Sequence, residues 1–416
     1  MVSTFVPFTA LFAAVLILMA GVGLLNTLLS LKLTLAGFAP QTIGGIMACY
    51  FVGLILGSVQ GHRLIERVGH IRAFAVFAAV TTGMVMLHGL FVSAALWALL
   101  RLLTGISIIG LYMVIESWLN ECTEPRTRGR IFSVYMIMSY LGMAVGQQLL
   151  NMGNVATQEL FFLVGFLVTF SLVPVAATHA IHPELPSAQH YRILPYFKRA
   201  PIGMLGSLSA GMINSAFYAM GPVFGHQIHL TVSELSAFMT ATILGGLAFQ
   251  WPVGIISDRF DRTLVLPLLG VMVAGAALLV IVVAEITYWL MIGVMAMFGG
   301  LIFAVYPVAV ARAHDLFERK DIVPVSSCLL FSYGIGAAVG PVGASTVMTW
   351  AESPYGFMGY IAMIAGIYAV VTWVLRRIEK VEIVPVADQV GFLAMESTSP
   401  MAVQLDPRAE IDSKGL

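Results

Sequence analysis

Long apolar runs, separated by short polar segments, fill almost the whole of this chain. A membrane-spanning helix needs roughly 20 mostly apolar residues, and twelve such runs can be read along the sequence. Because 59% of the 416 residues are hydrophobic and 10% are charged, the chain cannot cover its surface with polar groups in water. The pattern predicts an all-α membrane protein with 12 transmembrane helices. The runs lie near residues 8–30, 41–60, 71–90, 95–119, 131–151, 158–178, 201–225, 235–256, 264–284, 287–311, 323–346 and 355–376.

Positive charge marks one side of these runs. Of the 21 lysines and arginines, all but Lys32 and Arg101 fall in the segments that follow the even-numbered runs or in the tail. Because positively charged loops stay in the cytoplasm, these segments and both termini are expected to be cytoplasmic. The segments on the opposite side contain Glu159, Glu234, Glu285 and Glu352.

The sequence repeats itself at half its length. A shift of 192 residues aligns Glu66 and Arg67 with Asp258 and Arg259, and a shift of 194 aligns the paired glycines of runs five and eleven. A duplicated six-span unit predicts two six-helix halves in a pseudo-two-fold repeat. We therefore divide the chain into a first half at 1–178, a cytoplasmic central loop at 179–200, a second half at 201–380 and a polar tail at 381–416, which is expected to be disordered.

Several short segments resemble signatures of a transporter family. GIISDRFDR at 254–262 is similar to the cytoplasmic signature of the major facilitator superfamily, and LIERVGHIR at 64–72 is its first-half counterpart, with Glu66 in place of aspartate and His62 where glycine is usual. The resemblance covers the chain up to its tail and implies the fold of that superfamily in a bacterial inner membrane. The segments NTLLSLKL at 26–33, VIESWLNECTEPRTRGR at 114–130, QWPVGIISDRFDR at 250–262 and YPVAVA at 306–311 resemble its YcaD-like group.

The acid-arginine pairs in these signatures are candidates for a cytoplasmic latch. A carboxylate at the end of one span can bind the positive amino terminus of a helix in the other half, and a neighbouring arginine can pair with a further acid. Such contacts would hold the halves together in the outward-open state. An ordinary solvated loop charge is the alternative. The resemblance assigns the latch to Glu66, Arg67, Glu121, Arg128, Asp258 and Arg259.

Glycines four residues apart in runs five and eleven form a candidate helix-packing motif. This spacing lets helix backbones approach closely, and a proline removes one helical hydrogen bond. The family's antiporter signature is a Gly-Pro pair in the fifth span, whereas here Gln147 follows Gly146 and the Gly-Pro pair stands in the eleventh. That placement disfavours a drug antiporter. The motif comprises Gly142, Gly146, Gly336, Gly340 and Pro341.

Two charged residues stand inside the fourth run. Burial of Arg101 and Glu116 costs a few kcal/mol or more unless the charge is paired or wetted, and the repeat aligns them with Gly293 and Val310. The fold alone therefore does not require them. They share a helical stripe with Tyr112 but lie roughly 22 Å apart along the axis. Arg101 resembles the fourth-span arginine of proton-coupled facilitators. We expect both to serve proton coupling or solute binding, with a cytoplasmic arginine partner as the alternative for Glu116.

Polar and aromatic residues in the spans expected to face a central cavity are further candidates for solute binding. Their amides, hydroxyls and rings can hold a polar or amphipathic solute, although helix packing is the alternative for each. They are Asn26, Tyr50, Tyr112, Gln147, Asn214, Tyr218, Gln250, Trp251, Tyr306 and Tyr333.

These features predict a secondary transporter that moves a small organic solute by alternating access, coupled to the proton gradient, in efflux or exchange. The sequence has no Gly-x-x-x-x-Gly-Lys-Ser/Thr segment, and we expect no enzymatic activity, no cofactor and no metal site. Zero formal net charge disfavours nucleic acid. The expected partners are the solute and the lipid bilayer, around a monomer. Two alternatives remain: a uniporter or symporter of a neutral sugar-like solute, and a non-transporting receptor or scramblase.

The charge asymmetry makes a testable prediction about orientation. In a cysteine-free background, cysteines at Glu159, Glu285 or Glu352 should react with an impermeant thiol reagent from the periplasmic side, because these positions follow odd-numbered runs. A cysteine at Ser187, in the central loop, should react only from the cytoplasmic side. Labelling of cells and of inside-out vesicles measures the difference, and the reverse pattern would contradict the orientation.

Overall fold

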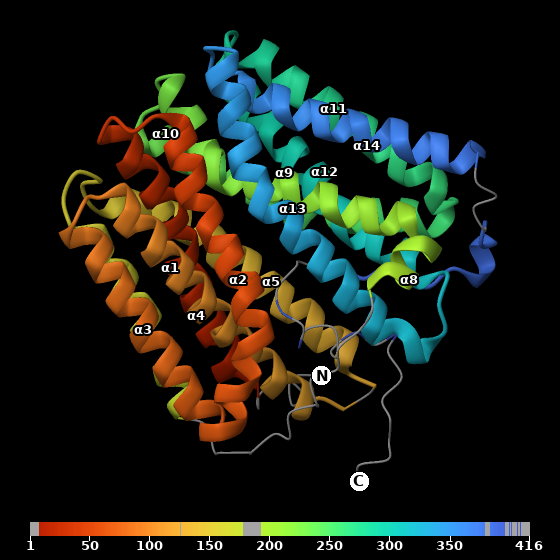
Figure 1. The fold of residues 1–416 in the computed structure, drawn as a ribbon, viewed down its shortest axis with the longest axis horizontal. Coiled ribbons are helices and arrows are strands. Elements are labelled where there is room, and N and C mark those ends of the chain that lie inside the picture. The colour runs from red at the N-terminus through yellow and green to blue at the C-terminus, as the bar shows by residue number, and fades with distance from the viewer. Residues whose placement is uncertain are drawn as a thin grey trace.

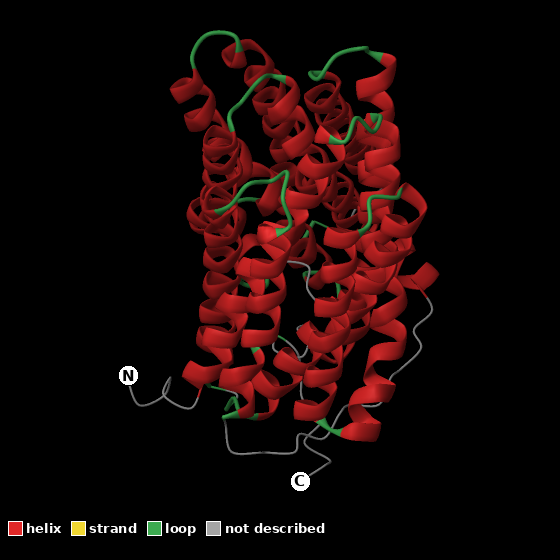
Figure 2. Cartoon of the chain, turned by 90° about the vertical axis from the view of Figure 1, so that its left-hand side faces the viewer, coloured by secondary structure: helices red, strands yellow, loops and turns green. Residues whose placement is uncertain are grey.

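The computed structural model describes residues 8–124, 126–177, 193–378 and 383–395, together with residues 399, 401, 406 and 408. Every long element in this part is a helix, and the helices run side by side as a bundle (Figure 2). The first half contains α1 (Thr9–Leu35), α2 (Pro40–Val68), α3 (His70–Leu90), α4 (Ala94–Glu121), α5 (Arg128–Leu149), α6 (Glu159–Phe170) and α7 (Leu172–Ala176). The second half contains α9 (Pro201–Gln227), α10 (Val232–Arg259), α11 (Arg262–Ala284), α12 (Tyr288–His314), α13 (Ile322–Trp350) and α14 (Gly356–Ile378).

The all-α membrane architecture predicted from the sequence is confirmed. Among the described residues, 11 spans are long and apolar enough to cross a bilayer, with α6 and α7 together forming one of them. The remaining predicted span is α9, which is 27 residues long but contains several glycines and serines and one asparagine. Most of its residues are buried, so α9 contacts protein rather than lipid. Of the expected central loop, residues 179–192 lie outside the described residues, and the rest includes the short helix α8 (Ile193–Arg199).

Helix pairs repeat between the halves. In the first half α2 packs on α4 and α1 on α5, and in the second half α10 packs on α12 and α9 on α13. Glycines make these approaches possible, because a Cβ at Gly53 or Gly105 would collide with the backbone of the facing helix, and the same holds at Gly245 and Gly299. The sequence repeat therefore corresponds to a repeat of close helix crossings.

The helix-packing motif lies at two of these crossings. A side chain at Gly146 would meet the backbone of Ala20 and Leu24 in α1, and one at Gly340 would meet the backbone of Met212 in α9. Gly142 and Gly336 face the same two helices. Pro341 lies where α13 meets the start of α2, because its carbonyl would contact a side chain at Gly44. These residues thus join helices both within and between the halves.

Helices α1, α4 and α12, like α9, lie in the interior of the bundle. Of the most apolar windows of α1, α4 and α12, 83%, 72% and 89% are buried within the protein, against 39% for α3 and α14. Polar residues on α1, α4 and α12 therefore face other helices, whereas α3 and α14 present apolar side chains outward.

The halves meet most directly at one end of the bundle. We call the end with the arginine-rich segments the basic end and the opposite end the acidic end. At the acidic end, Gln148 donates to Thr240 Oγ1 at 2.7 Å and Asn151 donates to Ser236 Oγ at 2.8 Å, both from the α5 side to α10. Figure 1 shows α1, α3 and α4 on one side of the molecule and α11, α12 and α14 on the other. The bundle is therefore closed between its halves at the acidic end.

The described part of the tail packs against the helices. The Phe392 amide donates to Asp258 Oδ1 at 2.9 Å, and Ser399 and Asp406 are each 1% exposed. The expectation of a disordered tail does not hold for these residues. Polar composition without periodicity predicts disorder only when no partner is at hand, and here charged side chains of the bundle bind the tail backbone.

The glycine crossings predict a specific stability defect. Gly146→Ala should lower the free energy of unfolding by about 1–3 kcal/mol, the usual cost of overpacking, because the added methyl group would meet the α1 backbone. Gly275→Ala is the control, since nothing lies within 4 Å of a Cβ at that position of α11. Thermal denaturation in detergent compares the two variants, and equal midpoints would show that the close approach does not limit stability.

Candidate functional site

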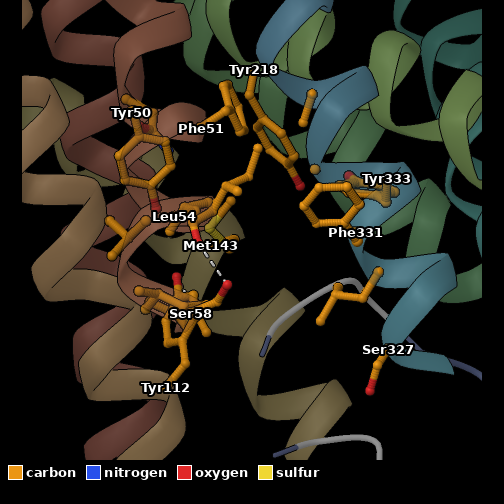
Figure 3. A pocket seen from close by; sticks show the side chains of 18 residues that line it. Tyr50, Phe51, Leu54, Ser58, Tyr112, Met143, Tyr218, Ser327, Phe331 and Tyr333 are labelled. Atoms are coloured by element: carbon orange, nitrogen blue, oxygen red, sulfur yellow. Dashed lines mark hydrogen bonds between the residues drawn. The ribbon is translucent and has the colours of Figure 1, made fainter. Parts of the chain in front are cut away.

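A cavity of about 190 Å³ lies between the two halves. Helices α1, α2, α4 and α5 line it from the first half, and α9 and α13 from the second (Figure 3). Five of the residues expected to bind solute form part of its wall: Asn26, Tyr50, Tyr112, Tyr218 and Tyr333. In Figure 3 the rings of Tyr218 and Tyr333 lie across the cavity from Tyr50 and Tyr112.

The rest of the wall was not identified from the sequence. It consists mainly of two helical stripes, one on α2 and one on α13. Their members are three, four and seven residues apart, which is the spacing of one helix face, so periodicity within these two spans could have indicated them. The stripes are Phe51, Leu54, Ile55 and Ser58 on α2, and Ser327, Leu330, Phe331, Gly334 and Ala337 on α13.

The chemistry of this wall is apolar with a few hydroxyl groups. None of the lining residues is charged, and Tyr112 Oη donates to Met19 Sδ at 3.6 Å. A wall of aliphatic and aromatic carbon with a small number of placed polar groups is typical of sites for small organic molecules.

Arg101 lies one layer behind this wall. Its side chain is 1% exposed, Nη2 donates to Asn26 Oδ1 at 3.0 Å, and the guanidinium carbon lies 4.2 Å from the centre of the Tyr50 ring. Among the described residues, Nε and Nη1 have no hydrogen-bond partner. Both contact residues line the cavity, so the positive charge acts on the cavity through them.

Glu116 lies one helical turn beyond Tyr112 toward the basic end and is fully buried. Its Oε1 accepts from Tyr135 Oη at 2.7 Å, and its Oε2 accepts a short hydrogen bond from Ser399 in the tail. Glu116 is not part of the cavity wall. It instead connects α4, α5 and the tail.

Four other candidates lie in helix contacts. Gln147 accepts from Thr27 at 2.6 Å and donates to the Gly23 carbonyl at 3.1 Å, which joins α5 to α1. Gln250 donates to Tyr140 Oη at 2.7 Å across the two halves. Asn214 is buried in α9, and Tyr306 packs edge-on against Tyr333 with ring centres 5.1 Å apart.

Trp251 does not face the cavity. It is 76% exposed on the outer surface of α10, so the sequence-based expectation was wrong for this residue. Consecutive helical residues point about 100° apart, and the neighbouring Gln250 faces inward. An exposed tryptophan on a membrane helix suits contact with lipid.

The acid-arginine segment of the second half forms a buried ion-pair network centred on Arg262. Arg262 Nη1 pairs with Asp315 Oδ1 and Nη2 with Asp258 Oδ1, each at 2.6 Å, and Nε donates to Ser257 at 3.0 Å. The Arg262 side chain is fully buried. Burial raises the pKa of Asp315, and the nearby guanidinium of Arg262 offsets part of that increase. Helical spacing does not account for the pair with Asp258, because α10 ends at Arg259 and α11 begins at Arg262, so the two residues lie on either side of the turn between these helices.

The other latch candidates stay separate in this arrangement. Glu66, Arg67, Glu121 and Arg259 are exposed and form no ion pair within the described part of the chain. Arg128 is buried at the start of α5. A contact between the halves at these residues remains a prediction for a different conformation.

The family model of the Major Facilitator Superfamily matches residues 11–304 of the sequence and, in a second match, residues 203–400. The chain belongs to the Major Facilitator Superfamily. It is 27% identical over 349 residues to the MFS-type transporter YcaD of Escherichia fergusonii, a match that covers 82% of this chain and 89% of that protein. It is also 27% identical over 382 residues to an MFS-type transporter of Yersinia enterocolitica, covering 89% of this chain and 95% of that one. The resemblance to the YcaD-like group is thereby confirmed.

Solved structures share the fold at low sequence identity. A bacterial homologue of the human lysosomal transporter Spinster, in an inward-facing and unoccupied conformation, superimposes with a TM-score of 0.68 at 13% identity and covers 99% of both chains. The nucleoside transporter NupG gives 0.70 at 13% identity, covering 88% of this chain and 98% of its own. A D-xylose-proton symporter gives 0.66 at 13% identity, with 92% and 99% covered. These likenesses establish the fold of this superfamily member.

The Arg262 network predicts a contrast between neighbouring arginines. Arg262→Gln should lower the free energy of unfolding by about 3–5 kcal/mol, because it leaves the buried carboxylate of Asp315 unpaired. Arg259→Gln should change it by no more than about 0.5 kcal/mol, because Arg259 is exposed. Denaturation by SDS in mixed micelles measures both, and similar stability of the two variants would contradict the network's structural role.

Proposed function

We propose that this protein is a proton-coupled secondary transporter that moves a small amphipathic organic solute across the bacterial inner membrane by alternating access. The observation that carries the proposal is the cavity between two pseudo-symmetric halves, with a wall of apolar residues and tyrosines contributed by both. A site shared by two rigid halves changes the side from which it is accessible when the halves rock against each other.

The orientation follows from the distribution of positive charge. The basic end is assigned to the cytoplasm, in accord with the positive-inside rule. Because the halves contact each other at the acidic end, this arrangement then corresponds to the inward-facing state. The cytoplasmic ends must approach each other for the cavity to open outward.

The charges around the cavity favour neutral or anionic solutes. The wall has no charged residue, and the buried Arg101 contacts the wall residues Asn26 and Tyr50. A fixed positive charge in a low-dielectric environment repels cations. A solute with an acceptor or anionic group near Asn26 and an apolar body against α2 and α13 fits this arrangement best.

Proton coupling is assigned to Glu116, with Arg101 as a fixed charge. As a carboxylate, Glu116 accepts a hydrogen bond from Tyr135, and in its protonated form it can donate one instead. The contact with α5 lies within one half, but the contact with the tail would change when the halves rock, which provides a route for loading and releasing a proton. Arginine stays protonated throughout.

The uncharged wall also supports a second candidate, a uniporter for a neutral solute. In that case Arg101 and Glu116 would serve structure alone. The two candidates differ in whether a pH gradient drives accumulation, so one assay distinguishes them.

The transport proposal is tested in proteoliposomes. Solutes are first selected by thermal shift from neutral, anionic and cationic metabolites, and we expect stabilisation only by the first two groups. With a selected solute, Glu116→Gln should abolish accumulation driven by a pH gradient while sparing solute exchange, because it fixes a neutral side chain. Arg101→Lys should lower both activities, because an ammonium does not replace the planar guanidinium.

The matched control is Glu124→Gln, since Glu124 is an exposed carboxylate three residues after the end of the same helix and is not a latch candidate. It should transport like the parent protein. If Glu116→Gln accumulates solute along a pH gradient as well as the parent does, the coupling assignment is wrong and the uniporter becomes the preferred candidate. If no flux of any stabilising solute occurs, the transport proposal itself fails.

A further inference from the structure

The basic end of the bundle binds an extended segment of the chain's own tail. The Val390 amide donates to Asp315 Oδ1 at 2.9 Å, and the Phe392 amide donates to Asp258 Oδ1 at 2.9 Å. The Val390 carbonyl accepts from Arg262 Nη2 at 2.6 Å. Alternate residues thus use their backbone groups, as an extended peptide does when it is bound along one edge. These bonds depend on backbone groups, so they are compatible with a polar segment of irregular sequence.

The side chain of Phe392 adds a packing contact to these backbone hydrogen bonds. Its ring lies directly over Gly254 in α10, where an added Cβ would collide with it. Gly254 is therefore a platform for the ring, and Asp258 lies one helical turn farther along the same face. The Gln389 amide group also donates to the Phe260 carbonyl at 3.4 Å.

The tail then contacts the first half and returns to the second. Ser399 donates its short hydrogen bond to Glu116 in α4. Asp406 pairs with Arg408 at 2.5 Å and lies 3.9 Å from His314 at the end of α12. Arg408 in turn donates to the Gly391 carbonyl at 3.2 Å. The described tail residues therefore bridge both halves at the basic end.

We propose that this surface is a binding site for an extended peptide and that the tail, as its resident occupant, acts as a gate. The gating role rests on the proposed alternating access. While the tail lies between the halves, their basic ends cannot meet. The tail also occupies the Asp258 carboxylate, which the sequence assigns to the latch of the opposite state. The tail and the latch therefore compete for one group. The surface consists of Glu116, Gly254, Asp258, Arg262 and Asp315.

The binding site is tested without any solute by disulfide formation. In a background lacking Cys49, Cys122 and Cys328, the pair Gly254→Cys and Phe392→Cys should cross-link under mild oxidation in proteoliposomes, because the ring at 392 contacts the position of a Cβ at 254. The control pair is Gly254→Cys with Val386→Cys, whose second member is an exposed tail residue. Peptide mass spectrometry counts the cross-linked fraction. Equal cross-linking of the two pairs, or none in either, would overturn the docking of the tail.

The gate is tested on the same cross-linked protein. A third cysteine at Ser58, in the cavity wall, is labelled with an impermeant maleimide from the acidic side after the cross-link has formed. The cross-link should slow this labelling at least about tenfold, because only the state with the tail in place remains populated, and reduction should restore it. An unchanged rate would refute the gate while leaving the peptide site intact. Because neither readout uses a solute, both results are independent of whether a transported solute is found.

Discussion

In the hydrocarbon core of a bilayer, every backbone polar group must find its partner within the protein. That requirement leaves helices as the form of a chain as apolar as this one, and it removes the hydrophobic effect as a force between them. Close packing must take its place. The glycines that face helix backbones at the α2–α4, α1–α5, α10–α12 and α9–α13 crossings provide it. The two halves are stable units because these crossings occur in both.

Because lipid surrounds the bundle, its polar and charged side chains gather on the interior helices. The interior helices α1 and α4 carry Asn26, Tyr112, Arg101 and Glu116, and the first two reach the cavity wall. Arg101 polarises the wall from behind through a hydrogen bond and a ring contact. Glu116 faces the basic end and the tail. Thus one helix carries one charge toward the cavity and one toward the basic end, which are the two places that the proposed alternating access would have to coordinate.

The Arg262 network connects the fold to the tail. Its two carboxylate partners neutralise the buried guanidinium, and the same three side chains have remaining donors and acceptors that bind the backbone at Val390 and Phe392. The ion pairs that join α10, α11 and the end of α12 in one half are thereby also the groups that hold the tail. Under the proposed gate, a tail bound there limits how closely the halves can approach each other at the basic end.

The sequence by itself determined the class of the protein, the number and approximate limits of the spans, the repeat and the family. Span length and charge asymmetry can be recognised locally, because the bilayer requires a minimum apolar length and retains positively charged loops in the cytoplasm. It also named ten cavity candidates, and half of them, among them Asn26 and Tyr50, line the cavity. Only the tertiary structure excluded Trp251, added the stripes of α2 and α13, and revealed the ion-pair network centred on Arg262. Which face of a helix meets another helix depends on the packing of both, and a tail held by its backbone leaves no pattern in its side chains.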